Sequence, residues 1–264
     1  MKIQQILDKC KALAMEAGRV IIKVYATDFD VEMKNDKSPL TIADINANEI
    51  IAKGLKDNFS EYSILSEESR DDKSRLTTDY CFIVDPLDGT KEFVKRNGQF
   101  TVNIALAYRH KVIIGVIYVP VTGELYYASK DQGAYLEKIG YREYKAENTR
   151  LKVTDKTRNL IMVGSKSHSS EKEARLIEDN KDKIKEILSA GSSLKGCMVA
   201  SGKADVYYRF GLTSEWDTAA MQCIVEEAGG IFRQMDGSEM LYNRENILNE
   251  KGFYVVNRRE NIWV

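Results

Sequence analysis

The segment Asp85-Pro86-Leu87-Asp88-Gly89-Thr90 follows directly on the apolar run Tyr80-Cys81-Phe82-Ile83-Val84. That run is short, β-branched and aromatic, which predicts a buried strand. Two carboxylates stand at its end, with Pro86 restricting the backbone and Gly89 allowing a tight exit into a short helical pattern. Carboxylates suit a divalent cation and a helix start favours an anion, so the segment predicts a joint metal and phosphate site. Taken alone, it is equally consistent with an ordinary turn.

Length and composition are typical of a globular protein. The chain has 264 residues, of which 43% are hydrophobic and 30% charged, enough for one large domain or two packed halves. Its 39 Lys and Arg residues balance 40 acidic ones, so the net charge of −1 gives no case for bulk binding of nucleic acid. The four cysteines stand apart within apolar patterns, which predicts buried thiols in a reducing, cytoplasmic setting. The apolar stretches are too short to span a bilayer.

The first half of the chain predicts two helices and a sheet. Apolar residues at three-to-four spacing predict an amphipathic helix over residues 3–24. The pattern Thr41-x-x-Asp44 predicts the capped start of a second helix. The side chains expected to face inward from it are Ile45, Ile50, Ile51 and Leu55. Strands are expected at residues 63–66, 100–108, 111–119, 125–129 and 134–136, and a mobile polar loop at 70–79.

The second half predicts alternating helices and strands. Residues 137–156 lack clear periodicity and are interpreted as the connection between an N-terminal α+β half, residues 1–145, and a C-terminal α/β half, residues 146–264. Helices are expected at 169–188, 194–202 and 217–228, and strands at 161–163, 206–208, 230–232 and 253–256.

Four carboxylates at the ends of predicted elements carry the chemistry: Glu67, Asp85, Asp88 and Asp217. If clustered, they would repel one another, and two divalent cations would cancel their charge. Oxygen-only ligands favour magnesium, and the chain has only two histidines, which argues against zinc. Asp217 also has an ordinary interpretation as a first-turn helix cap, and Asp44 as a first-turn acid or a partner of the metal site.

Three segments around these carboxylates resemble the sequence signatures of a known superfamily. Glu67-Glu68, the segment at 85–90 and Trp216-Asp217-Thr218-Ala219-Ala220 resemble the signatures of the inositol monophosphatase superfamily of magnesium-dependent, lithium-sensitive phosphatases. The resemblance covers nearly the whole chain. The segments at 89–93, 97–103, 191–195 and 204–209 resemble the branch of 3′(2′),5′-bisphosphate nucleotidases of CysQ type. Simple inositol monophosphatases usually carry Thr-Asn where this chain has Lys91-Glu92.

The resemblance implies a layered αβαβα sandwich in which both halves contribute sheets and the site lies between them. The implied ligands of two or three Mg²⁺ ions are Glu67, Asp85, the Leu87 carbonyl, Asp88 and Asp217. The implied catalytic residues are Asp44, Glu67 and Thr90, with Thr90 and Asp44 orienting or deprotonating the attacking water. The implied substrate-binding residues are Gly89, Thr90, Lys91, Ser165, His168, Gly191, Ser192, Lys195, Arg209 and Asp217. A solvated surface pair is the alternative for Lys195 and Arg209.

The implied activity is hydrolysis of the 3′-phosphate of adenosine 3′,5′-bisphosphate to AMP and phosphate, in the recycling of sulfur-assimilation nucleotides. A phosphatase for inositol or sugar phosphates is the alternative enzyme, and a non-catalytic phosphonucleotide-binding protein the alternative of another class. The expected partner is a small phosphorylated nucleotide, with no nucleic acid and no transmembrane segment. The expected location is the cytoplasm, with peripheral contact at the cytoplasmic side of the inner membrane left open. Monomer and homodimer are both consistent with the sequence.

Overall fold

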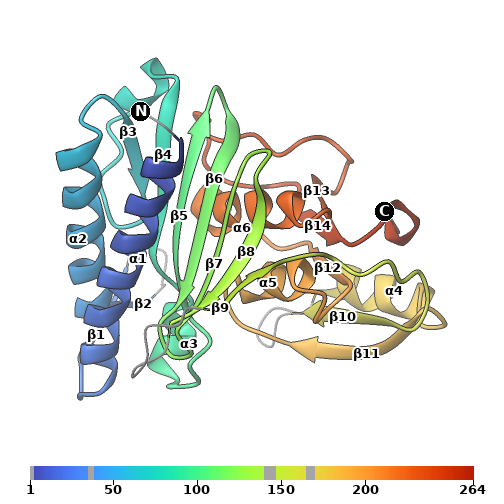
Figure 1. Cartoon of the computed structure of the whole chain (residues 1–264). Coiled ribbons are helices and arrows are strands. Elements are labelled where there is room, and N and C mark those ends of the chain that lie inside the picture. Colours follow the sequence, from blue (N-terminus) through green and yellow to red (C-terminus); the bar gives the residue numbers. More distant parts are fainter. Residues whose placement is uncertain (1–2, 35–38, 140–146, 165–169) are drawn as a thin grey trace.

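The computed structural model describes residues 3–34, 39–139, 147–164 and 170–264, and the structural statements below concern these residues. Helices and sheets alternate in layers (Figure 1). Two long helices form the first layer, α1 (Ile3–Tyr25) and α2 (Ile42–Asn58). Their buried apolar side chains pack on one face of a seven-stranded sheet. The expected cap of α2 is confirmed, because the Thr41 amide donates to Asp44 Oδ2 at 2.8 Å.

The seven-stranded sheet forms the second layer and runs in the order β3-β4-β5-β6-β7-β8-β9. The pair β3–β4 is parallel and the other pairs are antiparallel. Its strands are β3 (Ser63–Ser66), β4 (Tyr80–Asp88), β5 (Thr101–Tyr108), β6 (Lys111–Val119), β7 (Glu124–Ser129), β8 (Gly133–Lys138) and β9 (Glu147–Arg150). A small separate ladder pairs β1 (Val31–Met33) with β2 (Pro39–Thr41). Two short helical turns flank β4, namely η1 (Ser74–Thr77) and α3 (Thr90–Val94).

The helices α5 (Leu194–Ala200) and α6 (Glu215–Glu227) form the middle layer. α6 packs closely on the seven-stranded sheet because β6 has a glycine beneath it: a Cβ at Gly115 would lie 2.4 Å from the Ala220 carbonyl oxygen. The apolar side chains of α6, including Ala219, Cys223 and Ile224, therefore join the core between the two sheets. The helix that carries Asp217 thus lies between the two sheets.

The second sheet and an outer helix complete the fold. The sheet runs in the order β11-β10-β12-β14-β13. Its strands are β10 (Leu160–Gly164), β11 (Ile184–Ser189), β12 (Val206–Arg209), β13 (Ile231–Gln234) and β14 (Phe253–Val256). Leu176 of α4 (Glu171–Asp179) packs on its outer face with Trp263, just beyond η2 (Arg259–Asn261). The layered αβαβα architecture expected from the sequence is confirmed.

Most predicted elements are present, and the differences have physical causes. The helix expected at 169–188 is wrong in its second part, because the chain turns after Asn180 and β11 pairs as an exposed edge strand with β10. The loop at 70–79 is anchored rather than free, since the Arg75 side chain is only 2% exposed and pairs with Asp71. Ile45 does not face inward and is 39% exposed.

The connection predicted at 137–156 contains β9, which pairs with β8 although it follows residue 145. The division of the chain at 145/146 stays a prediction. All four cysteines are buried and unpaired, as expected. Across the described ranges, no helix combines the length and apolar character that crossing a membrane requires.

Candidate active site

The end of β4 places two carboxylates side by side. In the ladder with β5, Asp85 lies opposite Asn103 and Asp88 opposite Thr101, so β4 carries an extra residue between them. This bulge turns both acidic side chains toward the same region. The Leu87 amide donates to Asp85 Oδ1 at 3.1 Å and fixes the turn. Gly89 then leaves the strand with φ +92°, a conformation that favours glycine, and α3 begins.

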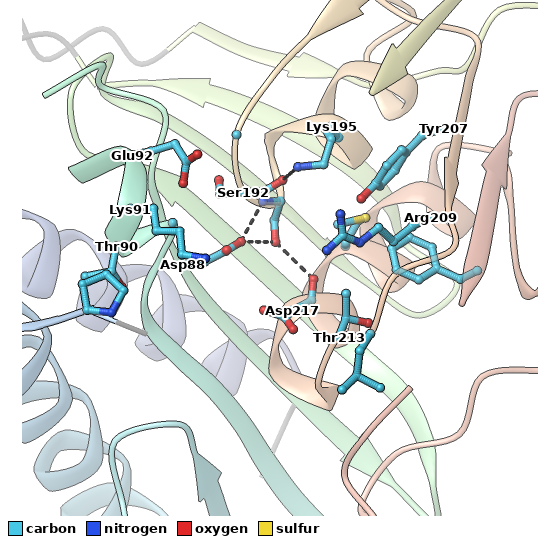
Figure 2. Close-up of a pocket in the computed structure, with 17 residues that line it drawn as sticks. Asp88, Thr90, Lys91, Glu92, Ser192, Lys195, Tyr207, Arg209, Thr213 and Asp217 are labelled. Carbon is cyan, nitrogen blue, oxygen red and sulfur yellow. Dashed lines mark hydrogen bonds between the residues drawn. The ribbon is translucent and has the colours of Figure 1, made fainter. Parts of the chain in front are cut away.

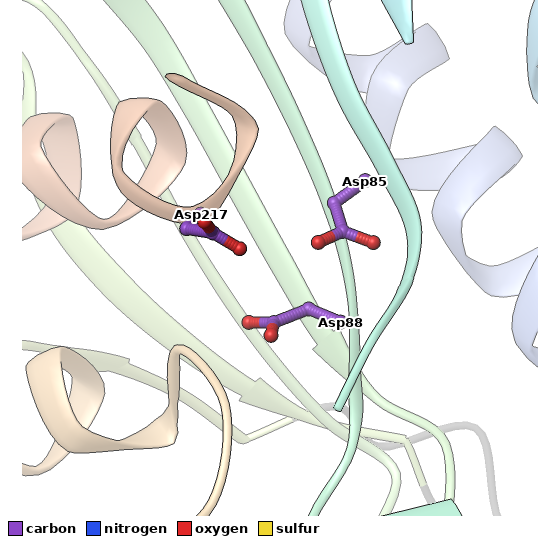
Figure 3. A group of neighbouring side chains, drawn as sticks. All are labelled: Asp85, Asp88 and Asp217. Carbon is purple, nitrogen blue, oxygen red and sulfur yellow. The ribbon is translucent and has the colours of Figure 1, made fainter. Parts of the chain in front are cut away.

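The third carboxylate arrives from the other half of the chain. Asp217 lies in the first turn of α6, where its Oδ2 accepts a 2.6 Å hydrogen bond from the Ser214 amide. It is therefore a helix cap, as its ordinary interpretation predicts. It is also a member of the acidic cluster, since carboxylate oxygens of Asp85, Asp88 and Asp217 all lie within 4.8 Å of one another (Figure 3). We call these three residues the acidic end of the site.

The acidic end has the electrostatics of a cation site. Burial and the charge of Glu67 raise the pKa of the Asp85 carboxyl well above its usual range. Burial and the charge of Asp88 raise the pKa of Asp217 to about 7. No described Lys or Arg forms an ion pair with these three carboxylates, although Asp85 is fully buried. Clustered carboxylate oxygens, buried at Asp85 and half-buried at Asp88 and Asp217, are the donor set that a hard divalent cation such as Mg²⁺ prefers.

Glu67 stands beside this cluster rather than within it. It follows β3, the parallel neighbour of β4, and its carboxyl is close enough to Asp85 that burial and the charge of Glu67 together raise the pKa of Asp85. The ammonium of Lys34 lies 2.9 Å from Glu67 Oε1 and also pairs with Glu68. Burial raises the pKa of Glu67 while Lys34 opposes this shift. Lys34 is a partner that sequence reasoning missed, because it is separated from Glu67 by more than thirty residues.

The structure joins the predicted pair Asp44 and Thr90. The Thr90 hydroxyl donates to Asp44 Oδ1 at 3.0 Å and lies 3.2 Å from the Leu87 carbonyl oxygen. The other oxygen of Asp44 accepts hydrogen bonds from Thr41. Burial raises the pKa of the Asp44 carboxyl. A hydroxyl held by a buried carboxylate next to the acidic end is placed to accept a proton from a water molecule.

A cavity of about 230 Å³ opens beside the acidic end (Figure 2). Thr90, Lys91 and Glu92 lie on one side of it, and Lys195, Tyr207 and Arg209 on the other. The predicted substrate-binding residues that line it are Gly89, Thr90, Lys91, Gly191, Ser192, Lys195, Arg209 and Asp217. Ser165 and His168 lie outside the described residues.

Lys195 and Arg209 form the cationic end of the cavity, and the surface-pair alternative for them is wrong. Lys195 is only 7% exposed, and its ammonium donates to the Ser192 carbonyl at 2.6 Å. Burial lowers the pKa of this ammonium to about 8. Arg209 Nε is buried and has no hydrogen-bond partner within the described part of the chain. Gly211 leaves room for this guanidinium, because a Cβ there would lie 3.2 Å from Arg209 Cζ.

Ser193 connects the two halves at the site, and sequence reasoning gave it no role. Its amide and hydroxyl donate to Asp88 Oδ2 at 2.7 and 2.6 Å. The hydroxyl also accepts from Asn103 Nδ2 at 2.9 Å and lies 3.2 Å from the Asp217 carbonyl oxygen. The signal was present in the pair Ser192-Ser193, but the sequence does not show which serine turns toward the carboxylates. Gly191 precedes them without a side chain, because a Cβ there would lie 2.6 Å from the Gln99 carbonyl oxygen.

Comparison with known proteins identifies the family. The inositol monophosphatase family matches residues 2–261. The chain is 39% identical over 254 residues to a 3′(2′),5′-bisphosphate nucleotidase CysQ of Salmonella typhimurium, covering 95% of this chain and 99% of the relative. It is 40% identical over 257 residues to the protein of that name in Buchnera aphidicola, covering 95% and 93%.

A crystal structure agrees with these matches. CysQ from Bacteroides thetaiotaomicron, described as a bacterial member of the inositol monophosphatase family, superposes with a TM-score of 0.85. It is 40% identical in sequence, and the alignment covers 97% of this chain and 99% of that one. The chain belongs to the inositol monophosphatase family.

Proposed function

We propose that this chain is a magnesium-dependent 3′(2′),5′-bisphosphate nucleotidase that hydrolyses the 3′-phosphate of adenosine 3′,5′-bisphosphate to AMP and phosphate. The observation that carries the proposal is one cavity lined by Asp88 and Asp217 at one end, with Asp85 close to both, and by Lys195 and Arg209 at the other. A substrate with two phosphates matches both ends. The CysQ relatives, which carry this activity in their name, support the same substrate class.

In the proposal, two or three Mg²⁺ ions are held by Glu67, Asp85, the Leu87 carbonyl, Asp88 and Asp217. When bound, the ions neutralise these carboxylates and the negative charge that develops on the phosphoryl oxygens. For Glu67 to serve as a ligand, the ammonium of Lys34 must give way at Oε1, where it now lies at 2.9 Å. Asp88 and Asp217 each keep one oxygen available, because their recorded hydrogen bonds to the backbone involve Oδ2 alone.

Thr90 and Asp44 move the proton of the attacking water. The Thr90 hydroxyl already donates to Asp44 Oδ1, so its oxygen presents lone pairs to the cavity. Water transfers its proton to Thr90 Oγ1 as the hydroxyl proton of Thr90 passes to Asp44. The raised pKa of Asp44 favours its acceptance of that proton.

Lys195 and Arg209 hold the 5′-phosphate and the ribose. Both are cations with donors left for a ligand, and charge-assisted hydrogen bonds to phosphate are among the stronger contacts in proteins. Lys91 approaches the same cavity from the opposite side. The proposal places the reaction in the cytoplasm, where the four buried thiols would stay reduced, and it includes no membrane contact.

A phosphate-release panel tests the proposal. The substrates are adenosine 3′,5′-bisphosphate, inositol 1-phosphate and fructose 1,6-bisphosphate, each with and without Mg²⁺. The expected result is magnesium-dependent release with the highest kcat/KM for the nucleotide. A preference for inositol 1-phosphate would assign the chain to the alternative enzyme. Tight nucleotide binding without release from any substrate would assign it to the non-catalytic alternative.

A further inference from the structure

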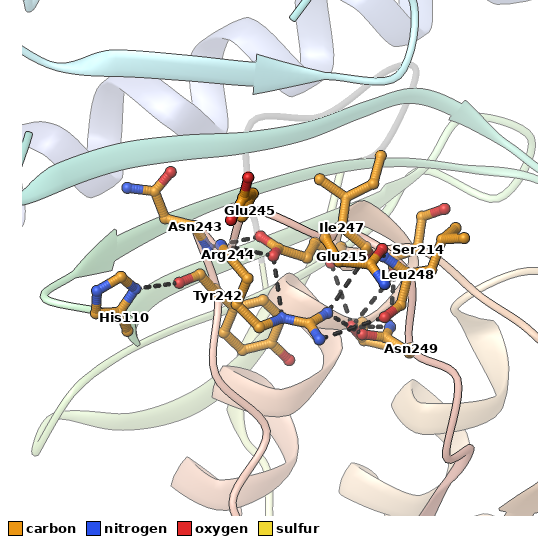
Figure 4. Close-up of polar contacts among 12 residues, drawn as sticks. His110, Ser214, Glu215, Tyr242, Asn243, Arg244, Glu245, Ile247, Leu248 and Asn249 are labelled. Atoms are coloured by element: carbon orange, nitrogen blue, oxygen red, sulfur yellow. Dashed lines mark hydrogen bonds and ion pairs between the residues drawn. The ribbon is translucent and has the colours of Figure 1, made fainter. Parts of the chain in front are cut away.

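The first turn of α6, which carries Asp217, is held by a polar segment that contributes no proposed metal ligand. Residues 242–249, which we call the clamp segment, cross this turn from outside (Figure 4). The Glu215 amide donates to the Ile247 carbonyl at 3.0 Å. Ser214 and Leu248 form an isolated antiparallel bridge. The clamp segment therefore meets the residues that flank Asp217 on the main chain.

Glu215 is the acceptor at the centre of these contacts. Its side chain is fully buried, although a carboxylate is among the side chains least often found so. Its Oε2 accepts from the Asn243 amide at 2.6 Å, and its Oε1 from the Arg244 amide at 2.9 Å and from Arg244 Nε at 3.2 Å. Asn243 has φ +55°, a turn that aims two successive amides at one carboxylate. All three hydrogen bonds end on Glu215, which lies two positions before Asp217 in the chain.

Arg244 also connects Glu215 to the C-terminal part of the clamp segment. Its guanidinium donates to Asn249 Oδ1 at 2.6 Å and to the Leu248 carbonyl at 3.3 Å. Asn249 in turn donates from Nδ2 to the Ser214 carbonyl at 2.8 Å and to Thr218 Oγ1 at 3.2 Å. Figure 4 shows Arg244 lying between Glu215 and Asn249. The Arg244 guanidinium thus binds Glu215 directly and Ser214 through Asn249.

The clamp segment is anchored at its other end to the sheet that carries Asp85 and Asp88. Arg75, in the turn before β4, donates from Nη1 to Asn243 Oδ1 at 2.8 Å, and Asn243 Nδ2 donates back to the Arg75 carbonyl at 3.0 Å. The Tyr242 amide donates to the His110 carbonyl at 2.9 Å, in the turn between β5 and β6. The segment therefore spans from the turns beside the seven-stranded sheet, which carries Asp85 and Asp88 on β4, to the first turn of α6, which carries Asp217.

We propose that Glu215 and Arg244 are positioning residues that set the distance of Asp217 from Asp85 and Asp88, and thereby the affinity of the site for divalent cations. The inference rests on the proposed metal site. Helix packing through Gly115 fixes the body of α6, while its first turn is held by the clamp segment and by the contact of the Ser193 hydroxyl with the Asp217 carbonyl. Partners that orient metal ligands typically change metal affinity or activity by roughly 10–100-fold when removed.

The test measures metal binding directly, with Mn²⁺ titrated into the full chain and free Mn²⁺ followed by electron paramagnetic resonance. Arg244→Ala and Glu215→Gln are expected to raise the dissociation constant for Mn²⁺ by about tenfold or more. The half-saturating Mg²⁺ concentration for phosphate release should rise in parallel, while the KM for the nucleotide at saturating Mg²⁺ changes less. A merely structural defect would not separate metal affinity from nucleotide affinity in this way.

Glu226→Gln is the matched control, because it removes an ion pair of 2.6 Å with Arg233 at the far end of the same helix. It is expected to leave Mn²⁺ affinity unchanged. Arg244→Lys keeps a charge near Glu215 but loses the guanidinium contacts, and an intermediate loss of affinity is expected; it decides the case if Arg244→Ala does not fold. Unchanged Mn²⁺ affinity in folded Arg244 variants would overturn the inference. If the unmodified chain binds Mn²⁺ but releases no phosphate, the proposed function fails and the affinities still decide the role of the clamp segment.

Discussion

The acidic end of the site, formed by Asp85, Asp88 and Asp217, has hydrogen-bond donors directed at its carboxylates, whereas the cationic end, formed by Lys195 and Arg209, has donors that are free to bind a ligand. Asp88 Oδ2 alone accepts from the Ser193 amide and hydroxyl. At the other end, Arg209 Nε has no partner among the residues that the structure describes. The protein thus fixes the geometry of the acidic end by hydrogen bonds, and in the proposed function cations neutralise its charge. In the same proposal an anionic ligand completes the cationic end.

The largest expected effect is at the acidic end. Asp88→Asn should lower kcat/KM by more than the roughly 100-fold typical of partners of metal ligands, since it removes a ligand itself. The amide oxygen can still accept from Ser193, and one repelling charge is gone, so the unfolding midpoint without metal should not fall. Phosphate release measured as a function of Mg²⁺ concentration checks the loss of activity. Thermal unfolding of the metal-free chain checks the stability. Normal magnesium-dependent turnover in this variant would contradict the role of the acidic end.

The next effect concerns the proton path beside the acidic end. Thr90→Val removes the hydroxyl that donates to Asp44 at 3.0 Å and should lower kcat by about 100-fold or more, the usual worth of a positioned acid or base. Mn²⁺ affinity should stay close to that of the unmodified chain. Thr90→Ser, which keeps a hydroxyl, is the matched control and should retain most of the activity. Equal kcat in the valine and serine variants would remove Thr90 from the mechanism.

A smaller effect, selective for substrate, is expected at the cationic end. Charge-assisted hydrogen bonds contribute about 1.5–3 kcal/mol, or roughly ten- to a hundredfold in kcat/KM. Lys195→Ala should therefore impair adenosine 3′,5′-bisphosphate far more than adenosine 3′-monophosphate, which lacks the second phosphate. The two enzymes and two substrates form a cycle that yields a coupling energy. Equal losses on both substrates would mean that Lys195 does not read the 5′-phosphate.

The same residue predicts a pH dependence. Burial lowers the pKa of Lys195 to about 8, so its ammonium is charged below that pH and becomes neutral above it. kcat/KM for the bisphosphate, which reports ionisations of the free enzyme, should fall by roughly fivefold between pH 8 and pH 9, as the charged fraction of Lys195 falls. Lys195→Arg, which stays charged, should flatten this limb of the profile. An unchanged limb in the arginine variant would assign the ionisation to another group.

The smallest effect is expected where the two halves meet. Ser193→Ala keeps the amide contact to Asp88 and removes only the hydroxyl that also meets Asn103 and the Asp217 carbonyl. One hydrogen bond contributes about 0.5–1.5 kcal/mol, so kcat/KM should fall by roughly two- to tenfold. Ser192→Ala is the comparison variant, because among the described residues the Ser192 hydroxyl contacts the Thr101 hydroxyl and no carboxylate. A larger loss of Mn²⁺ affinity in the Ser192 variant than in the Ser193 variant would show that the wrong serine has been given this role.

Local patterns in the sequence predicted most elements of the fold. Three-to-four apolar spacing locates α1, because burial of one helix face requires that spacing, and short apolar runs locate β5 to β7, which are buried on both faces. The same reasoning failed for β11, a charged edge strand whose pairing with β10 is parallel and therefore non-local. It also failed for Arg75, whose burial depends on Asn243, far away in the chain.

The sequence by itself determined that Asp85 and Asp88 stand together at a strand end, since three residues and a bulge leave them little freedom. It also determined, through the family resemblance, that Asp217 belongs with them. Only the tertiary structure decided how Asp217 reaches them, which serine binds Asp88, and that Lys195 is buried beside Arg209. The physical reason is that Ser193 and Asp217 both lie more than 100 positions from Asp88, and their distances to it depend on the packing of α6 between two sheets and on the clamp segment.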